Sequence, residues 1–182
     1  KRQTLDTLLK DETLEIVFIV PRNDTKDEYL KNKALEYGID YLMPVKVNSE
    51  EFYQKAINYG CDLFVSMSYN QIFKRKIFDL PPCKTINCHA GKLPFYRGRN
   101  ILNWVLINDE KEFGITVHYV DEGIDTGDII LQRTFPITDA DSYNTLLQVA
   151  YEACPKILYQ AIKDIQAGKA KRVPQDLSLI HI

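Results

Sequence analysis

The sequence has few cysteines, no long apolar run and no excess of positive charge. Its 182 residues include four cysteines, none of them two residues apart, so a disulfide scaffold or a zinc knuckle is disfavoured. The longest apolar runs have the length of one strand, far below the roughly 20 residues that cross a bilayer, and no apolar signal segment opens the chain. A net charge of -2 offers no basic field for a phosphate backbone. These absences predict a cytoplasmic protein without a metal, a nucleic-acid partner or a membrane.

Short β-branched runs alternate with helical segments in the first half of the chain. The runs 14–20, 39–42, 61–67 and 84–89 are predicted strands. A polar helix ends at Tyr37 with Gly38 as its C-cap, and another covers 49–60. This alternation predicts an α/β fold, a Rossmann-like and mostly parallel sheet with helices on both faces.

The pattern changes after Phe113. Two longer β runs, 114–121 and 128–137, are joined by a glycine-rich turn and predict an antiparallel C-terminal excursion. A final amphipathic helix covers 143–165, and Pro155 is expected to kink or restart it. The chain is expected to be truncated at both ends, with a catalytic domain over 1–176 that lacks its first strand and a non-native-looking or unstructured tail over 177–182.

The densest polar chemistry lies between Asn87 and Asp128. Asn87 and His89 are two positions apart at the end of a predicted strand, so their side chains share a face. The carboxyl ends of strands in open α/β sheets border the ligand crevice. A cationic loop with Lys92, Arg97 and Arg99 follows and leads into the helix 100–108, where Trp104 is expected in the core. Such a loop suits a phosphate.

The second half of the candidate site is the turn 121–128, which is rich in carboxylates and glycine. Its alternative interpretation is a surface hairpin loop. An amide, an imidazole and a carboxylate together can assist attack on a carbonyl, because they stabilise the oxyanion, move a proton and orient the imidazole. No serine or cysteine stands in a recognisable nucleophile elbow, so direct transfer is favoured over a covalent route.

Two long runs, INCHAGKLPFYRGRNILNWVLINDE and FGITVHYVDEGIDTGDIILQ, carry a resemblance to a known family. They contain Asn-x-His, then Leu-Pro-x-Tyr-Arg-Gly, then Asp-x-Gly-x-Asp-Thr-Gly. These motifs closely resemble the formyltransferases that use 10-formyltetrahydrofolate, and the likeness extends over most of the chain. The resemblance implies the formyltransferase fold, formyl-transfer activity and 10-formyltetrahydrofolate as the donor, with no metal.

The resemblance also implies roles for individual residues. The catalytic Asn, His and Asp of the family fall on Asn87, His89 and Asp125, which would bind the oxyanion, accept the ammonium proton and stabilise the protonated imidazole. The folate is expected in a cleft lined by Met67, Tyr69, Ile72, His118, Val120, Asp121 and Gly123, with Tyr69 as a stacking platform. The diphosphate of a nucleotide substrate would meet Lys92, Tyr96, Arg97 and Arg99.

For the acceptor, the run from Arg97 into the helix looks most like enzymes that formylate nucleotide-linked amino sugars, such as dTDP-linked 3-amino or 4-amino dideoxyhexoses, for the O-antigen of lipopolysaccharide. The transfer-RNA enzymes typically have Ser-Leu-Leu-Pro and Ala-Pro before this helix, where this chain has Gly91-Lys92-Leu93-Pro94 and Asn100-Ile101. The resemblance also allows a homodimer. The alternatives are glycinamide ribonucleotide formyltransferase, to which 116–132 is similar, methionyl-tRNA formyltransferase, an inactive folate-binding module and a structural or interaction domain.

Overall fold

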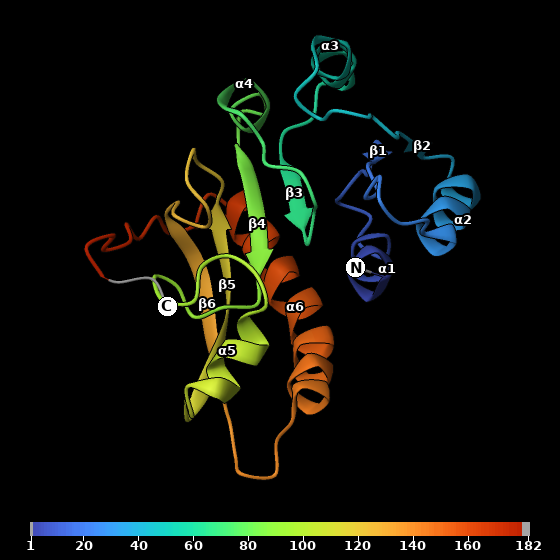
Figure 1. The fold of residues 1–182 in the computed structure, drawn as a ribbon. Helices are drawn as coiled ribbons and strands as arrows, with labels where there is room; N and C mark the ends of the chain where they lie inside the picture. The colour runs from blue at the N-terminus through green and yellow to red at the C-terminus, as the bar shows by residue number, and fades with distance from the viewer. Residues whose placement is uncertain (1, 180–182) are drawn as a thin grey trace. The chain divides into compact units, whose positions relative to one another are not determined.

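The computed structural model describes residues 2–179, and the chain divides into two compact units with the boundary between Thr85 and Ile86 (Figure 1). Helices and strands alternate along most of the described chain, so the predicted α/β class is confirmed. Within residues 2–179, no helix is both long and apolar enough to cross a membrane.

The N-terminal unit contains the predicted alternation in shortened form. Its elements are α1 (Arg2–Leu8), β1 (Phe18–Ile19), α2 (Glu28–Tyr37), β2 (Asp40–Tyr41), α3 (Glu50–Tyr59), β3 (Phe64–Met67) and α4 (Arg75–Phe78). The side chains of Asp27 and Ser49 cap α2 and α3, and Gly38 and Gly60 end these helices in the left-handed conformation. The strands β1 and β2 pair in parallel.

The predicted strand over 14–20 is longer than the observed one. β1 has two residues, because β2 offers a ladder of only two residues, in which Phe18 lies opposite Asp40 and Ile19 opposite Tyr41. Phe18 of this apolar run packs against other aromatic rings of the N-terminal unit. The ring of Phe18 contacts those of Phe52, Tyr59 and Phe64, with ring centroids 4.8 to 6.3 Å apart.

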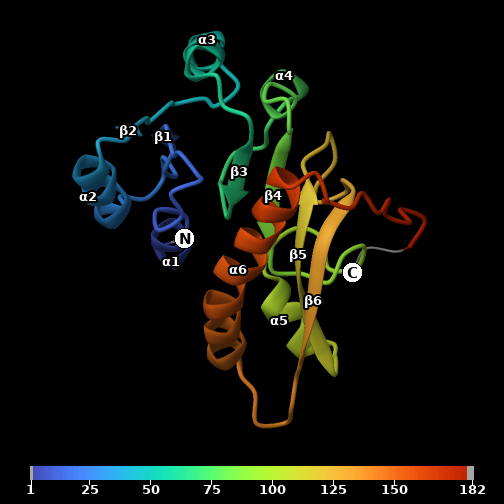
Figure 2. The same ribbon diagram turned by 180° about the vertical axis from the view of Figure 1, so that it is seen from behind.

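The C-terminal unit is built on antiparallel strands. Its elements are β4 (Thr85–His89), which begins at the unit boundary, α5 (Ile101–Ile107), β5 (Glu112–Tyr119), β6 (Ile129–Pro136) and α6 (Tyr143–Gln166). β5 pairs antiparallel with both β4 and β6, as the predicted excursion requires. Figures 1 and 2 show α6 lying along one face of these strands, and the core between them includes Ile115, Val117, Leu146 and Leu158.

Of the two alternatives expected at Pro155, the restart of the helix is excluded, and the expected core position of Trp104 is wrong. α6 runs without interruption from Tyr143 to Gln166, with Pro155 buried inside it, so the helix does not restart there. Packing of the apolar face of α6 on the strands outweighs the one backbone hydrogen bond that a proline forfeits. Trp104 on α5 is 45% exposed rather than part of the core, because the seven-residue helix turns Leu102 and Val105 inward instead.

Candidate functional site

The three residues predicted to be catalytic lie together in the C-terminal unit. Asn87 and His89 lie near the end of β4 with their side chains on one face, and Asn87 pairs with His118 on β5. Asp125 reaches the same place from the loop between β5 and β6. The strand periodicity and the antiparallel register therefore bring together side chains that are up to 38 positions apart.

The carboxylate of Asp125 is the centre of this cluster. Its Oδ1 lies 3.4 Å from Nδ2 of Asn87 and 3.4 Å from Nε2 of His118. Its Oδ2 accepts a hydrogen bond from the backbone N–H of Gly98 at 2.9 Å and lies 3.5 Å from Nδ1 of His89. The side chain is only 14% exposed, so these four groups form most of its surroundings.

The surroundings of Asp125 stabilise its ionised form. Burial raises the pKa of this carboxyl, but the hydrogen bond with His118, the nearby imidazole of His89 and the N–H of Gly98 together lower the pKa to about 2. Asp125 is therefore ionised at neutral pH.

His89 is held in one orientation by the loop that follows its strand. Its Nε2 lies 2.7 Å from the carbonyl oxygen of Tyr96, which can only accept a hydrogen bond. Nε2 therefore carries a proton, and Nδ1 faces Asp125. A proton taken up by this ring at Nδ1 would be stabilised directly by the carboxylate of Asp125.

His118 is a member of the cluster, although the sequence assigned it to the folate pocket. Its Nδ1 lies 2.7 Å from the carbonyl oxygen of Tyr119, which can only accept a hydrogen bond, so Nδ1 carries a proton. Its Nε2 lies 3.2 Å from Nδ2 of Asn87 and 3.4 Å from Oδ1 of Asp125. The side chain is 3% exposed. His118 thus orients the amide of Asn87 and pairs with Asp125.

Gly91 allows the loop after β4 to pass close to His89. A Cβ atom at this position would lie 2.3 Å from Nε2 of His89 and 2.5 Å from the carbonyl oxygen of Tyr96. Gly91→Ala is therefore expected to displace the imidazole, to lower the free energy of unfolding by about 1 to 3 kcal/mol, and to lower any activity that depends on His89.

Urea unfolding and an activity assay would measure both effects. Gly168→Ala is the control, because a Cβ there meets no atom within 4 Å and the variant bears only the strain of a positive φ. Equal activity of Gly91→Ala and Gly168→Ala would contradict the expectation.

The predicted substrate-binding residues have different surroundings. Lys92 forms an ion pair with Glu112, and Arg97 donates a hydrogen bond to the carbonyl oxygen of Leu179 at 3.5 Å. Tyr96 is buried, and its hydroxyl bonds to Glu110 and Asn108, so it contributes to the loop structure. Arg99 is exposed. Because α5 has only seven residues, the cations of the loop, rather than the helix dipole, carry the predicted attraction for a phosphate.

Three of the predicted folate residues belong to the loop between β5 and β6 that carries Asp125. Val120 and Asp121 begin this loop and are half-buried, whereas Gly123 is exposed at its tip. Oδ1 of Asp121 accepts hydrogen bonds from the N–H of Gly123 at 3.1 Å and from the hydroxyl of Thr126 at 2.6 Å. Asp121 therefore closes the loop as an Asx turn.

Three further predicted folate residues, Met67, Tyr69 and Ile72, belong to the N-terminal unit. The sulfur of Met67 lies 3.5 Å from the hydroxyl of Thr4. The ring of Tyr69 stacks on Phe73, with centroids 5.4 Å apart and planes 3° from parallel, so one of its faces is already covered within this unit. Ile72 is 67% exposed. Their part in folate binding stays a prediction.

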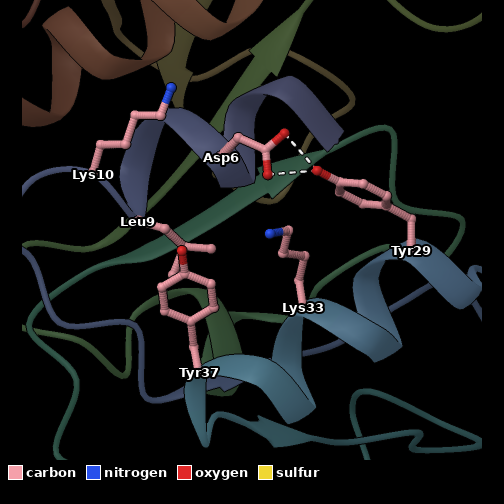
Figure 3. A pocket seen from close by; sticks show the side chains of 6 residues that line it. All are labelled: Asp6, Leu9, Lys10, Tyr29, Lys33 and Tyr37. Atoms are coloured by element: carbon pink, nitrogen blue, oxygen red, sulfur yellow. Dashed lines mark hydrogen bonds between the residues drawn. The ribbon is translucent and has the colours of Figure 1, made fainter.

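A separate pocket lies between α1 and α2 of the N-terminal unit (Figure 3). The hydroxyl of Tyr29 donates to both carboxylate oxygens of Asp6 at 2.6 Å, and Lys33 forms an ion pair with Glu36. None of the residues predicted for the site lines this pocket, whose lining is Asp6, Leu9, Lys10, Tyr29, Lys33 and Tyr37.

An amide, two imidazoles and a carboxylate converge near the ends of the strands of this α/β protein. Such a set of groups suits an enzyme that transfers a proton and stabilises an oxyanion. Comparison with known proteins defines the class further. The profile of the Formyl transferase family matches residues 2–162. The chain belongs to this family, as the sequence motifs predicted.

Two curated relatives in the comparison are methionyl-tRNA formyltransferases. The chain is 38% identical over 149 residues to the methionyl-tRNA formyltransferase of Kosmotoga olearia, covering 82% of this chain and 48% of that protein. The enzyme of the same name from Ruminiclostridium cellulolyticum is 35% identical over 150 residues, again with 82% and 48% covered. The chain thus spans about half the length of the curated relatives it matches.

The solved structures share the fold at lower identity. Glycinamide ribonucleotide transformylase 1 from Symbiobacterium toebii has a TM-score of 0.81 at 22% identity, with 94% of this chain and 89% of that chain covered. WlaRD, a sugar 3N-formyl transferase solved with dTDP and 5-N-formyl-THF, has a TM-score of 0.76 at 24% identity, with 100% and 65% covered. At such identities the likeness shows the fold alone.

Proposed function

We propose that the protein transfers the formyl group of 10-formyltetrahydrofolate to a primary amine by direct attack. The observation that carries this proposal is the convergence of Asn87, His89 and Asp125 within one buried cluster. Family membership supports the donor, since formyl-THF is present in the structure of WlaRD. We also propose that the protein is cytoplasmic and forms a homodimer.

In the proposed reaction, the amine nitrogen forms a bond to the formyl carbon, and the bond from that carbon to the folate nitrogen breaks. The amide of Asn87 donates to the oxygen that becomes negative as the amine attacks. Its hydrogen bond to Asp125, at 3.4 Å, is longer than its contact with His118, at 3.2 Å. The bond to Asp125 is the one exchanged for the oxyanion, while the contact with His118 keeps the amide in place.

His89 removes the proton that the attacking amine must lose. Its Nδ1 is the basic nitrogen, because Nε2 already donates to Tyr96, and Asp125 stabilises the imidazolium that forms. The proton is then returned to the folate nitrogen, which leaves as a neutral amine. The net change is the transfer of the formyl group from the folate nitrogen to the amine nitrogen and of one proton from the amine to the folate nitrogen.

For the acceptor we propose the amine of a nucleotide-linked amino sugar. The run Gly91-Lys92-Leu93-Pro94 and the pair Asn100-Ile101 support this choice, and the exposed guanidinium of Arg99 is available for a diphosphate. A second candidate is methionyl-tRNA, which the 38% identity to the enzyme of Kosmotoga olearia favours. The charge of the chain does not separate the two, because the curated relatives are about twice as long.

Mass spectrometry of the reaction products tests the function and the acceptor together. The protein is incubated with 10-formyltetrahydrofolate and, in separate reactions, a pool of nucleotide-linked amino sugars, methionyl-tRNA or glycinamide ribonucleotide. We expect a formylated sugar that is absent with His89→Asn. Formylation of methionyl-tRNA alone would transfer the proposal to the second candidate, and formylation of glycinamide ribonucleotide alone would reject both acceptors. Folate binding without any product would indicate an inactive module.

A further inference from the structure

The segment Arg172–Gln175, here called the strap, lies against the loop that carries Asp125. Val173 forms an antiparallel bridge with Ile129 at the start of β6, in which each backbone N–H donates to the other residue's carbonyl at 2.8 and 3.0 Å. The strap follows the match to the family, which ends at residue 162.

Gln175 bonds to the loop on both sides of Thr126. Its Nε2 donates to the backbone carbonyl of Asp125 at 3.0 Å and to that of Gly127 at 2.6 Å. Asp125 has a φ of +54°, a conformation that costs a residue with a side chain about 1 kcal/mol or more. The side-chain amide of Gln175 therefore fixes the backbone at the strained residue.

The base of the loop is fixed by the same strap. The guanidinium of Arg172 lies 4.0 Å from the ring centroid of Tyr119 and 3.8 Å from the carboxylate of Asp128. Tyr119 donates its N–H to the carbonyl of Asp128 at 2.9 Å. The carbonyl of Tyr119 in turn orients His118. Both ends of the loop are thus tied to four consecutive residues.

We propose that Gln175 is a positioning residue for the reaction, which holds the backbone of Asp125 so that its carboxylate meets His89 and Gly98. This inference rests on the proposed function. Both acceptors are carbonyl oxygens, so the site requires two N–H donors on one side chain. A carboxylate at this position would repel both oxygens, and an apolar side chain would leave them without the donor.

The test compares Gln175→Met and Gln175→Glu, which keep the length of the side chain but lack the amide. The control is Gln160→Met, because Gln160 is an exposed glutamine on α6 that bonds to Asp164. We expect both Gln175 variants to lower kcat by about 10- to 100-fold, with KM for each substrate changed less than about threefold. The control should keep the wild-type values.

A second measurement does not depend on activity. The N–H of Gly98 donates to Oδ2 of Asp125, so its hydrogen exchange should be at least about tenfold faster in both Gln175 variants than in the control. If the wild type formylates none of the acceptors, the proposed function fails, and this exchange rate still decides whether Gln175 positions Asp125. Unchanged exchange at Gly98, or a raised KM with an unchanged kcat, would overturn the inference.

Discussion

His89→Gln is expected to lower turnover by about 100- to 10,000-fold, the range that a positioned proton acceptor contributes. The amide nitrogen of glutamine can occupy the place of Nε2 and keep the hydrogen bond to the carbonyl of Tyr96. It has no basic nitrogen to replace Nδ1 opposite Asp125. The variant therefore separates the chemical role of the imidazole from its structural one.

His89→Asn is the matched comparison. Its shorter amide reaches toward Asp125 but loses the contact with Tyr96, so it should be as inactive as His89→Gln and less stable. Single-turnover rates with saturating donor would measure the first effect, and urea unfolding the second. A glutamine variant that retains more than about a tenth of the wild-type rate would contradict the assignment of His89 as the proton acceptor.

Asp125→Asn is expected to lower turnover by about 100- to 10,000-fold as well, because an amide cannot stabilise the imidazolium of His89. Asparagine tolerates the left-handed backbone conformation that residue 125 adopts, so the loop itself should be preserved. The comparison is Asp121→Asn, which changes a carboxylate of the same loop that contacts Gly123 and Thr126. Equal rates for the two variants would contradict a specific role for Asp125.

The same variant should change the acid stability of the protein. The folded-state pKa of Asp125, about 2, lies below the ordinary value of 3.8, so the carboxylate stabilises the folded state by about 2 kcal/mol above the unfolded pKa. This contribution is lost as the pH falls through the folded pKa, and about half of it is gone by pH 3. The difference in unfolding free energy between wild type and Asp125→Asn should therefore be larger at pH 7 than at pH 3. A constant difference would reject the lowered pKa.

Local patterns in the sequence were enough to predict the α/β class and most element positions. The capping signal at Gly38 acts within one helical turn, and the structure ends α2 there, while the helix predicted over 49–60 is observed as α3 between its caps Ser49 and Gly60. The length of β1 was overestimated, because the extent of a strand depends on the ladder that its neighbour offers. Continuation of α6 through Pro155 likewise depends on packing against the strands.

By itself, the sequence determined the family and the three side chains of the candidate site. Residues two positions apart on a strand must share a face, and the motifs around Asn87, His89 and Asp125 are specific. Only the tertiary structure decided how these side chains meet. The antiparallel register places His118 opposite Asn87, and the strap brings Gln175 to a loop 50 positions earlier. Such contacts leave no periodic signal in the sequence, because they depend on how distant segments of the chain pair and pack.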